Sequence, residues 1–181
     1  MDLTLARPSL ALCPSYLAFV EELRAAGDTV WPGRVPADDE PAEAFVLRQL
    51  RRESAPEPGA VPESVYWGVV DGCVVGRIAL RHALDERLAR FGGHVGYEVR
   101  PSWRRRGVAT GLLRLVLATD HARALGRVLV TCAPANTGSR RAIEANGGEL
   151  AAIVFSEEAQ RDTCHYWLQT SSIHDSRVGI R

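Results

Sequence analysis

The stretch RPSWRRRGVATG, residues 100–111, places three consecutive arginines directly before Gly107. Small residues and then apolar residues at helical spacing follow, so the stretch predicts a tight turn that leads into a helix. The first N–H groups of a helix have no partner within it, and the helix dipole adds partial positive charge at that end. Arg104, Arg105 and Arg106 add charge in the same place. The stretch therefore predicts an anion site, with phosphate or pyrophosphate as the natural ligand.

Two familiar phosphate-binding motifs are excluded. A Walker A loop requires a lysine, and the chain contains none. The dinucleotide fingerprint G-x-G-x-x-G is also missing. What remains is the pattern R-x-x-G-x-A, formed by Arg104, Gly107 and Ala109, in which glycine lets the backbone approach a ligand closely.

The elements around this turn predict a parallel pair of strands. HVGYEVRP, residues 94–101, is typical of a central strand that a proline ends. Apolar spacing predicts a helix over residues 108–125, which Gly126 ends. RVLVTCA, residues 127–133, is typical of a buried strand. A strand–helix–strand connection favours parallel neighbours, so these two strands are expected to lie side by side.

The rest of the chain predicts a single α/β (α+β) domain over residues 1–170, with a flexible tail at 171–181. Asp71-Gly72 joins two apolar runs and is a strong hairpin signal. The order of elements predicts a mixed, mostly antiparallel sheet with helices on both faces. The further expected elements are strands at 3–6, 149–155 and 164–169, helices at 9–27, 41–53 and 137–146, and a loop or short helical turn at 82–93.

Composition limits the function. Lys+Arg and Asp+Glu number 22 each, so general attraction to nucleic acid or to an anionic membrane is not expected, and recognition must be local. The four cysteines are far apart, which argues against a metal site and against a disulfide framework. There is no pattern of a signal peptide and no apolar run of about 20 residues. We therefore expect a soluble, cytoplasmic protein without a metal.

Three motifs in order resemble the GNAT superfamily of N-acyltransferases over residues 64–168. Arg104, Gly107 and Ala109 resemble its acyl-CoA signature, which is Gln or Arg, two residues, Gly, one residue, then Gly or Ala. Residues 96–101, GYEVRP, resemble the strand that precedes this signature. Residues 136–148 resemble its later segment, with anchors at Asn136, Ser139, Glu144 and Gly147.

The resemblance implies transfer of an acetyl group from acetyl-CoA to a primary amine, directly and in a ternary complex. It implies a sheet splayed between its fourth and fifth strands, with the cofactor in the gap. Val99 would bind pantetheine and the thioester carbonyl through its backbone. The residues implied to hold the rest of the cofactor are Arg104, Arg105, Arg106, Gly107, Val108, Ala109, Thr110, Asn136, Ser139 and Arg140.

Proton transfer leaves alternatives open. Glu98, next to Val99, is a candidate general base, or else a structural ion pair or a contact to the substrate ammonium. His94 is a weaker candidate, for which a hydrogen bond at the strand end is favoured. The family often carries a tyrosine acid seven residues after the motif asparagine, but this chain has Ile143 there. Tyr166 is a substitute, although packing is its favoured role.

Several residues outside the motifs also have two interpretations. Cys132 ends the strand before the cofactor loop, but no base lies near it in sequence, so nucleophilic catalysis is disfavoured. Trp103 either contacts adenine or packs on arginine side chains. The acceptor region is expected near Trp31, and acids at Asp38, Asp39, Glu40, Glu157 and Glu158 either attract a cationic amine or are solvated loop charges, which is favoured.

Two other functions remain open. The missing tyrosine motivates a non-catalytic acyl-CoA binder or sensor of the same fold. A nucleic-acid module that uses the arginines is disfavoured by the balanced charge. The expected partners are acetyl-CoA and a small-molecule or peptide amine, and the resemblance allows a homodimer.

Overall fold

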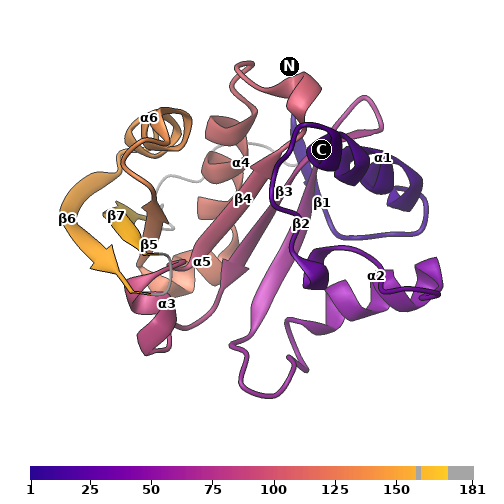
Figure 1. The fold of residues 1–181 in the computed structure, drawn as a ribbon, viewed down its shortest axis with the longest axis horizontal. Coiled ribbons are helices and arrows are strands. Elements are labelled where there is room, and N and C mark those ends of the chain that lie inside the picture. Colours follow the sequence, from indigo (N-terminus) through magenta and orange to yellow (C-terminus); the bar gives the residue numbers. More distant parts are fainter. Residues whose placement is uncertain (158–159, 171–181) are drawn as a thin grey trace.

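A computed structural model describes residues 1–157 and 160–170, and the predicted tail lies outside them. The described strands form one sheet in the order β1-β2-β3-β4-β5-β7-β6 (Figure 1). All neighbouring pairs are antiparallel except β4 and β5, which are parallel, so the predicted mixed sheet and its parallel pair are confirmed. The strands are β1 (Thr4–Ala6), β2 (Glu63–Val70), β3 (Cys73–Arg81), β4 (Val95–Val99), β5 (Arg127–Cys132), β6 (Glu149–Ser156) and β7 (Arg161–Gln169).

Helices cover both faces of the sheet, as expected. The α-helices are α1 (Cys13–Ala25), α2 (Ala42–Arg51), α3 (Glu86–Arg90), α4 (Val108–Leu117), α5 (Asp120–Leu125) and α6 (Thr137–Glu144), with 3-10 turns η1 (Pro32–Arg34) and η2 (Pro101–Trp103). The first helix begins later than predicted, at Cys13, where a proline fits its first turn. Among the described residues, none of the helices combines the length and the apolar character needed to cross a membrane.

The prediction of a single helix over residues 108–125 is wrong, because the helix is interrupted at Thr119. This residue is extended, with φ −73° and ψ 155°, and its hydroxyl donates to the Val116 carbonyl at 2.7 Å. The same hydroxyl accepts a weak hydrogen bond from the Ala122 amide at 3.4 Å and so caps α5. Apolar periodicity continues through the break, which is why the sequence pattern does not show it.

Two apolar cores lie on the two faces of the sheet, and the one beneath α4 extends from β3 and β4 to β5 and β7. One core is aromatic and joins α1 and α2 to the sheet, with Tyr16 stacked on Trp67 at 4.4 Å between ring centroids. The other lies beneath α4, whose Leu112 and Leu113 are fully buried. Gly76 lets α4 lie close to the sheet, since a Cβ there would be 2.9 Å from a Leu112 methyl carbon. The turn that precedes α4 is thereby held near the carboxyl end of β4.

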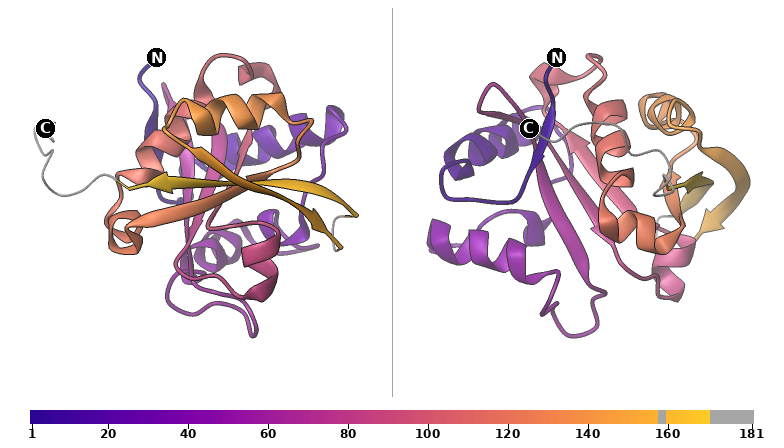
Figure 2. Two further views of the ribbon diagram at one scale, coloured as in Figure 1. Left: turned by 90° about the vertical axis from the view of Figure 1, so that its left-hand side faces the viewer. Right: turned by 180° about the vertical axis from the view of Figure 1, so that it is seen from behind.

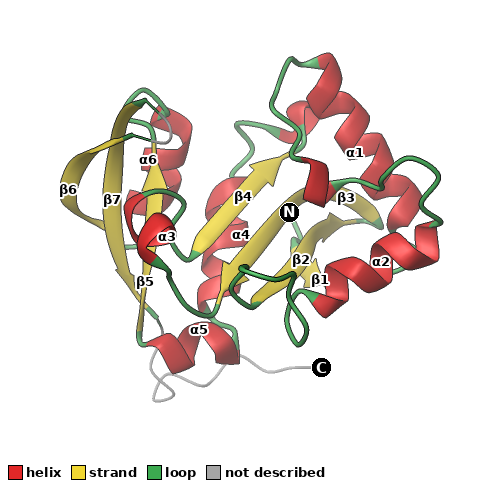
Figure 3. Cartoon of the chain, turned by 60° about the horizontal axis from the view of Figure 1, so that its bottom comes forward, coloured by secondary structure: helices red, strands yellow, loops and turns green. Residues whose placement is uncertain are grey.

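The sheet opens between β4 and β5 (Figure 3). These strands share one ladder pair, Val95↔Val130. Just before it, the His94 amide donates to the Leu129 carbonyl at 2.7 Å, and His94 Nδ1 accepts from the Leu129 amide at 2.9 Å. Beyond this joint the strands diverge, and β5, β7 and β6 form a twisted wall that carries α6 (Figure 2). The splay that the resemblance implied is present.

Candidate functional site

A cleft of about 1310 Å³ occupies the gap between the diverging strands. Its lining comes from β4, β5, the first turns of α4 and α6, α3 and the η1 loop. Arg106 and Arg140 are not among the lining residues. The predicted site residues that do line it are Glu98, Val99, Arg104, Arg105, Gly107, Val108, Ala109, Thr110, Asn136 and Ser139.

The turn before α4 presents unpaired backbone donors to this cleft. Gly107 has φ 78° and Arg105 has φ 59°, so the chain turns through the left-handed region twice within three residues. Within the described part of the chain, the amides of residues 105–110 donate no hydrogen bond to protein, and the first helical bond runs from Gly111 to Gly107 at 2.9 Å. A Cβ on Gly107 would meet no protein atom within 4 Å. This arrangement suits a pyrophosphate.

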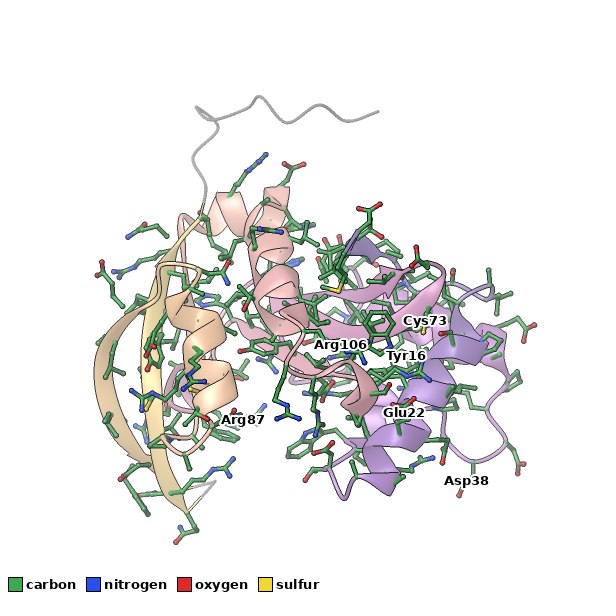
Figure 4. The ribbon with its side chains drawn as sticks, turned by 90° about the horizontal axis from the view of Figure 1, so that it is seen from above. Tyr16, Glu22, Asp38, Cys73, Arg87 and Arg106 are labelled. Atoms are coloured by element: carbon green, nitrogen blue, oxygen red, sulfur yellow. The ribbon has the colours of Figure 1, made fainter. Side chains whose placement is uncertain are left out.

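The three arginines of the turn have different surroundings. Arg104 forms an ion pair with Asp28, and its Nε donates to the Val99 carbonyl at 3.3 Å. Arg105 lines the cleft. Arg106, labelled in Figure 4, places its guanidinium 5.3 Å from the ring centroid of Trp103. The Trp103 ring is therefore packed on an arginine, which was one of its two expected roles.

Two hydroxyl groups from opposite walls of the cleft are in contact, one from Tyr97 on β4 and one from Ser139 on α6. Ser139 Oγ lies 2.7 Å from Tyr97 Oη, and Asn136 Oδ1 accepts from the Ser139 amide at 3.0 Å, which caps α6. Burial raises the pKa of Tyr97 to about 12, although its hydrogen bond with Ser139 acts in the other direction. Sequence reasoning missed Tyr97. The available signal was strand alternation, because Tyr97 shares a face of β4 with Val99.

The position of the family's usual tyrosine acid lies in the core. The Ile143 side chain is completely buried. Arg140, which was expected at the cofactor, instead donates from Nε to Tyr166 Oη at 3.0 Å. Tyr166 in turn donates to Glu144 at 3.0 Å, and it does not line the cleft. Packing within this cluster accounts for Tyr166.

Glu98 faces away from Tyr97 and Val99 and forms an ion pair with Arg34 of η1. Its side chain is 19% exposed and lines the cleft, so solvent can reach its carboxylate. One of its alternative roles, the ion pair, is thus present in the structure. An ion pair and a proton-accepting role are compatible, because the pair fixes the carboxylate in one orientation.

His94 forms the strand-end hydrogen bond that was favoured for it and does not line the cleft. Burial, with a smaller contribution from Arg81, lowers its pKa to about 4. A neutral imidazole fits its role as an acceptor from the Leu129 amide. Its position makes it part of the β4–β5 joint.

The remaining candidates have ordinary surroundings. Cys132 lines the cleft, but burial raises the pKa of its thiol, which disfavours a thiolate. Glu40 is paired with Arg48 at 2.7 Å, and Asp38 extends from the periphery of the molecule (Figure 4). Glu157 is exposed, and Glu158 lies outside the described residues. Among the described residues, no group of three or more His, Cys, Asp or Glu side chains could hold a metal ion.

Comparisons with known proteins agree with this architecture. A family model described as an acetyltransferase (GNAT) domain matches residues 2–149. No curated protein matches the chain in sequence. Among solved structures, the chain is similar to the microcin C7 self-immunity acetyltransferase MccE in complex with acetyl-CoA and AMP, with 15% identity, a TM-score of 0.67 and coverage of 93% of each chain.

Two further structures share this fold. Mycobacterium smegmatis RimJ in complex with CoA-disulfide is 19% identical, with a TM-score of 0.66 and coverage of 92% of this chain and 81% of the other. The aminoglycoside acetyltransferase AAC(6')-Ib in complex with coenzyme A is 16% identical, with a TM-score of 0.60 and coverage of 98% of this chain and 100% of the other. At these identities the likeness concerns the fold.

Proposed function

Because the chain belongs to the GNAT acetyltransferase family, we propose that it transfers an acetyl group from acetyl-CoA directly to a primary amine in a ternary complex. Acetyl-CoA supplies an activated thioester when bound. The observation that carries the proposal is the turn over residues 105–110, whose free amides open into the cleft where β4 and β5 diverge.

The two walls of the cleft have separate binding roles in this proposal. The amides of residues 105–110 and Arg105 hold the pyrophosphate at the start of α4. Asn136 and Ser139 contact the cofactor from the α6 side. The backbone amide of Val99 donates to the thioester carbonyl, where negative charge develops during attack.

Glu98 accepts the proton that an ammonium acceptor must lose before it attacks. Its carboxylate lines the cleft on the face of β4 opposite Val99, and Arg34 holds it in place. A proton acceptor there, acting directly or through one water, keeps the amine neutral at the moment of attack.

We expect Glu98→Gln to lower kcat/KM by about 100-fold near pH 7, because the amide cannot accept the proton. The loss should shrink as the pH rises, since the fraction of free amine then increases in solution. A pH–rate profile of both forms with one acceptor measures this. Equal profiles would show that Glu98 is not the base.

The hydroxyl pair Tyr97–Ser139 supplies a proton to the departing thiolate. The two oxygens are 2.7 Å apart in the cleft, and Tyr97, whose pKa burial raises to about 12, carries its proton at neutral pH. In this proposal, the pair replaces the tyrosine acid that the family often carries at the position of Ile143, whose side chain cannot donate a proton.

Thiol release from acetyl-CoA across a broad panel of amines tests the function. We expect turnover with at least one class of primary amine. The buried Ile143 motivates the second candidate, a non-catalytic acyl-CoA binder. Tight CoA binding in calorimetry without thiol release for any amine would favour that second candidate.

A further inference from the structure

Four arginines gather beneath the face of β4 that carries Glu98. This arginine cluster consists of Arg34 from η1, Arg52 at the end of α2, and Arg77 and Arg81 from β3. The Arg77 side chain is 1% exposed, and the other three are between 17% and 29% exposed. Guanidinium groups that are so withdrawn from water need negative partners.

The carboxylates available to the cluster are too few. Glu63 serves three of the arginines, with ion-pair distances of 2.5 Å to Arg52, 3.6 Å to Arg81 and 3.9 Å to Arg77. Glu98 pairs with the fourth, Arg34. Among the ion pairs of the described residues, four guanidinium groups thus share two carboxylates. The cluster has an excess of positive charge.

Burial and the excess of positive charge together lower the pKa values of two of these arginines. Burial, together with repulsion from Arg77 and Arg81, lowers the pKa of Arg34 to about 9. Burial also lowers the pKa of Arg81, and Arg77 adds to this. A bound anion would relieve the repulsion between these cations and offset the cost of their burial.

Gly96 leaves an opening above the cluster. A Cβ on this residue would lie 3.9 Å from Nη2 of Arg81 and 4.0 Å from Nη2 of Arg34. All three residues line the cleft. Gly96 precedes Glu98 by two residues on the same face of β4, a separation of about 6.6 Å along a strand. The space between the two guanidinium groups is therefore next to the place of proton transfer.

We propose that the acceptor amine carries an anionic oxygen group, a carboxylate or a phosphate, which binds over Gly96 between Arg34 and Arg81. This inference rests on the proposed function, since it places the amine of the same molecule at Glu98. Planar guanidinium groups suit both anions and bind them through charge-assisted hydrogen bonds.

The charge along the whole cleft supports an anionic acceptor. Besides Arg87, six arginines of the described residues line the cleft, but only two carboxylates do. Both carboxylates are already paired, Glu98 with Arg34 and Asp28 with Arg104. The formal charge of the whole chain is zero, so this concentration of cations is local. A polyamine acceptor would meet repulsion here.

A matched series of acceptors tests the proposal. The probes are 5-aminopentanoate, its amide, 1,5-diaminopentane and an aminoalkyl phosphate of similar length. We expect kcat/KM to be about tenfold to a hundredfold higher for an anionic probe than for the amide, the range for a charge-assisted hydrogen bond. The carboxylate and phosphate arms show which anion fits. An amide or diamine that reacts as well as both anions would overturn the proposal.

Gly96→Asp and Gly96→Asn provide a matched pair of variants. The aspartate places a carboxylate of the protein between Arg34 and Arg81, and the asparagine has the same shape without the charge. We expect Gly96→Asp to melt about 2–4 °C above Gly96→Asn at neutral pH. It should also lose acetylation of anionic probes while it keeps its affinity for CoA. Equal melting temperatures would contradict an excess of positive charge at this place.

The two proposals fail separately. A chain that binds CoA but acetylates no amine contradicts the proposed function. Equal rates of acetylation for anionic, neutral and cationic acceptors would contradict the anion site but would still support the proposed acetyltransferase function. The melting temperatures of the two variants report on the anion site without any turnover.

Discussion

Side chains along β4 alternate between two different environments. Tyr97 and Val99 face the opening toward α6, where Tyr97 meets Ser139. Gly96 and Glu98 face the opposite side, where Arg34 lies. In a strand, neighbouring residues point to opposite faces, so these four consecutive positions would serve the cofactor on one side and the proposed acceptor on the other. The reaction that we propose takes place at the boundary between them.

Tyr97→Phe removes one hydroxyl of the pair and should lower kcat by about 100-fold, because the thiolate loses its proton donor. KM for acetyl-CoA and CoA affinity should stay within twofold. Steady-state kinetics with saturating acceptor measures the separation. Tyr66→Phe is the matched control, since Tyr66 lies beside Arg7 and does not line the cleft. An unchanged kcat for Tyr97→Phe would remove the pair from the mechanism.

His94 predicts a dependence of stability on pH. Its pKa falls from an ordinary value of 6.5 to about 4 in the folded chain, so folding favours the neutral form. Its contribution is therefore complete above about pH 6.5 and is lost as the pH falls toward 4, by about 3 kcal/mol in total. Urea unfolding at several pH values measures this loss.

His94→Asn is the comparison for that experiment, because its side-chain oxygen can still accept from the Leu129 amide but does not titrate. The free energy of unfolding of the variant should fall less steeply between pH 6.5 and 4 than that of the wild type. Identical slopes would show that another group, such as His82 with its lowered pKa, accounts for the acid sensitivity.

At the scale of elements, α4 connects the core to the cleft. Its buried face, with Leu112 and Leu113, packs on the sheet, and its first turn opens into the cleft. The left-handed conformation of Gly107 directs the amides that follow it toward the cleft. Packing of the helix on the sheet thus fixes the position of the free amides that we propose bind the pyrophosphate.

Gly107→Val should weaken CoA binding by about 100-fold, because its side chain enters the space beside the free amides. The strain of a positive φ should lower the free energy of unfolding by about 1–2 kcal/mol. Gly126→Val is the matched control. Gly126 has φ 72° and, like Gly107, open space around its Cβ, but it does not line the cleft. Calorimetry should show a loss of affinity for Gly107→Val alone.

At the scale of the whole molecule, one apolar core joins the two walls of the cleft, because it contains side chains of β3, β4 and α4 as well as of β5, α6 and β7. The joint at His94 and Leu129 closes one end. At the α4–α6 contact, Asn146 Nδ2 donates to the Thr110 carbonyl at 3.1 Å. A ligand that spans both walls should therefore stabilise the fold as a whole.

CoA at about 100 times its Kd should raise the melting temperature by about 5–10 °C, because it binds the folded chain and not the unfolded one. A thermal unfolding series with increasing CoA measures this. Pantetheine, which lacks the pyrophosphate, should give a much smaller rise at equal concentration. An equal rise with both ligands would contradict the role of the turn at residues 105–110.

How far the sequence predicts this protein depends on the range of the interactions involved. Gly107 and Asp71-Gly72 mark turns through local backbone preferences, so both turns are correctly placed. The hairpins and the parallel pair β4–β5 follow from connection rules, and the sheet confirms them. The position of β7 between β5 and β6 was not predicted. The break at Thr119 was missed because one side chain caps a helix within an unbroken apolar pattern.

By itself, the sequence determined the strand at residues 94–100, the turn that follows it, the start of the helix at Val108, the family and its acetyl-CoA, because these are encoded by neighbouring residues. Only the tertiary structure decided which charges line the cleft. Arg34, Arg81 and Gly96 come from three elements, and the hydroxyls of Tyr97 and Ser139 are 42 positions apart in the chain. Such groups come together only when the sheet and its helices pack, and the spacing of residues in the sequence does not predict how close they lie in space.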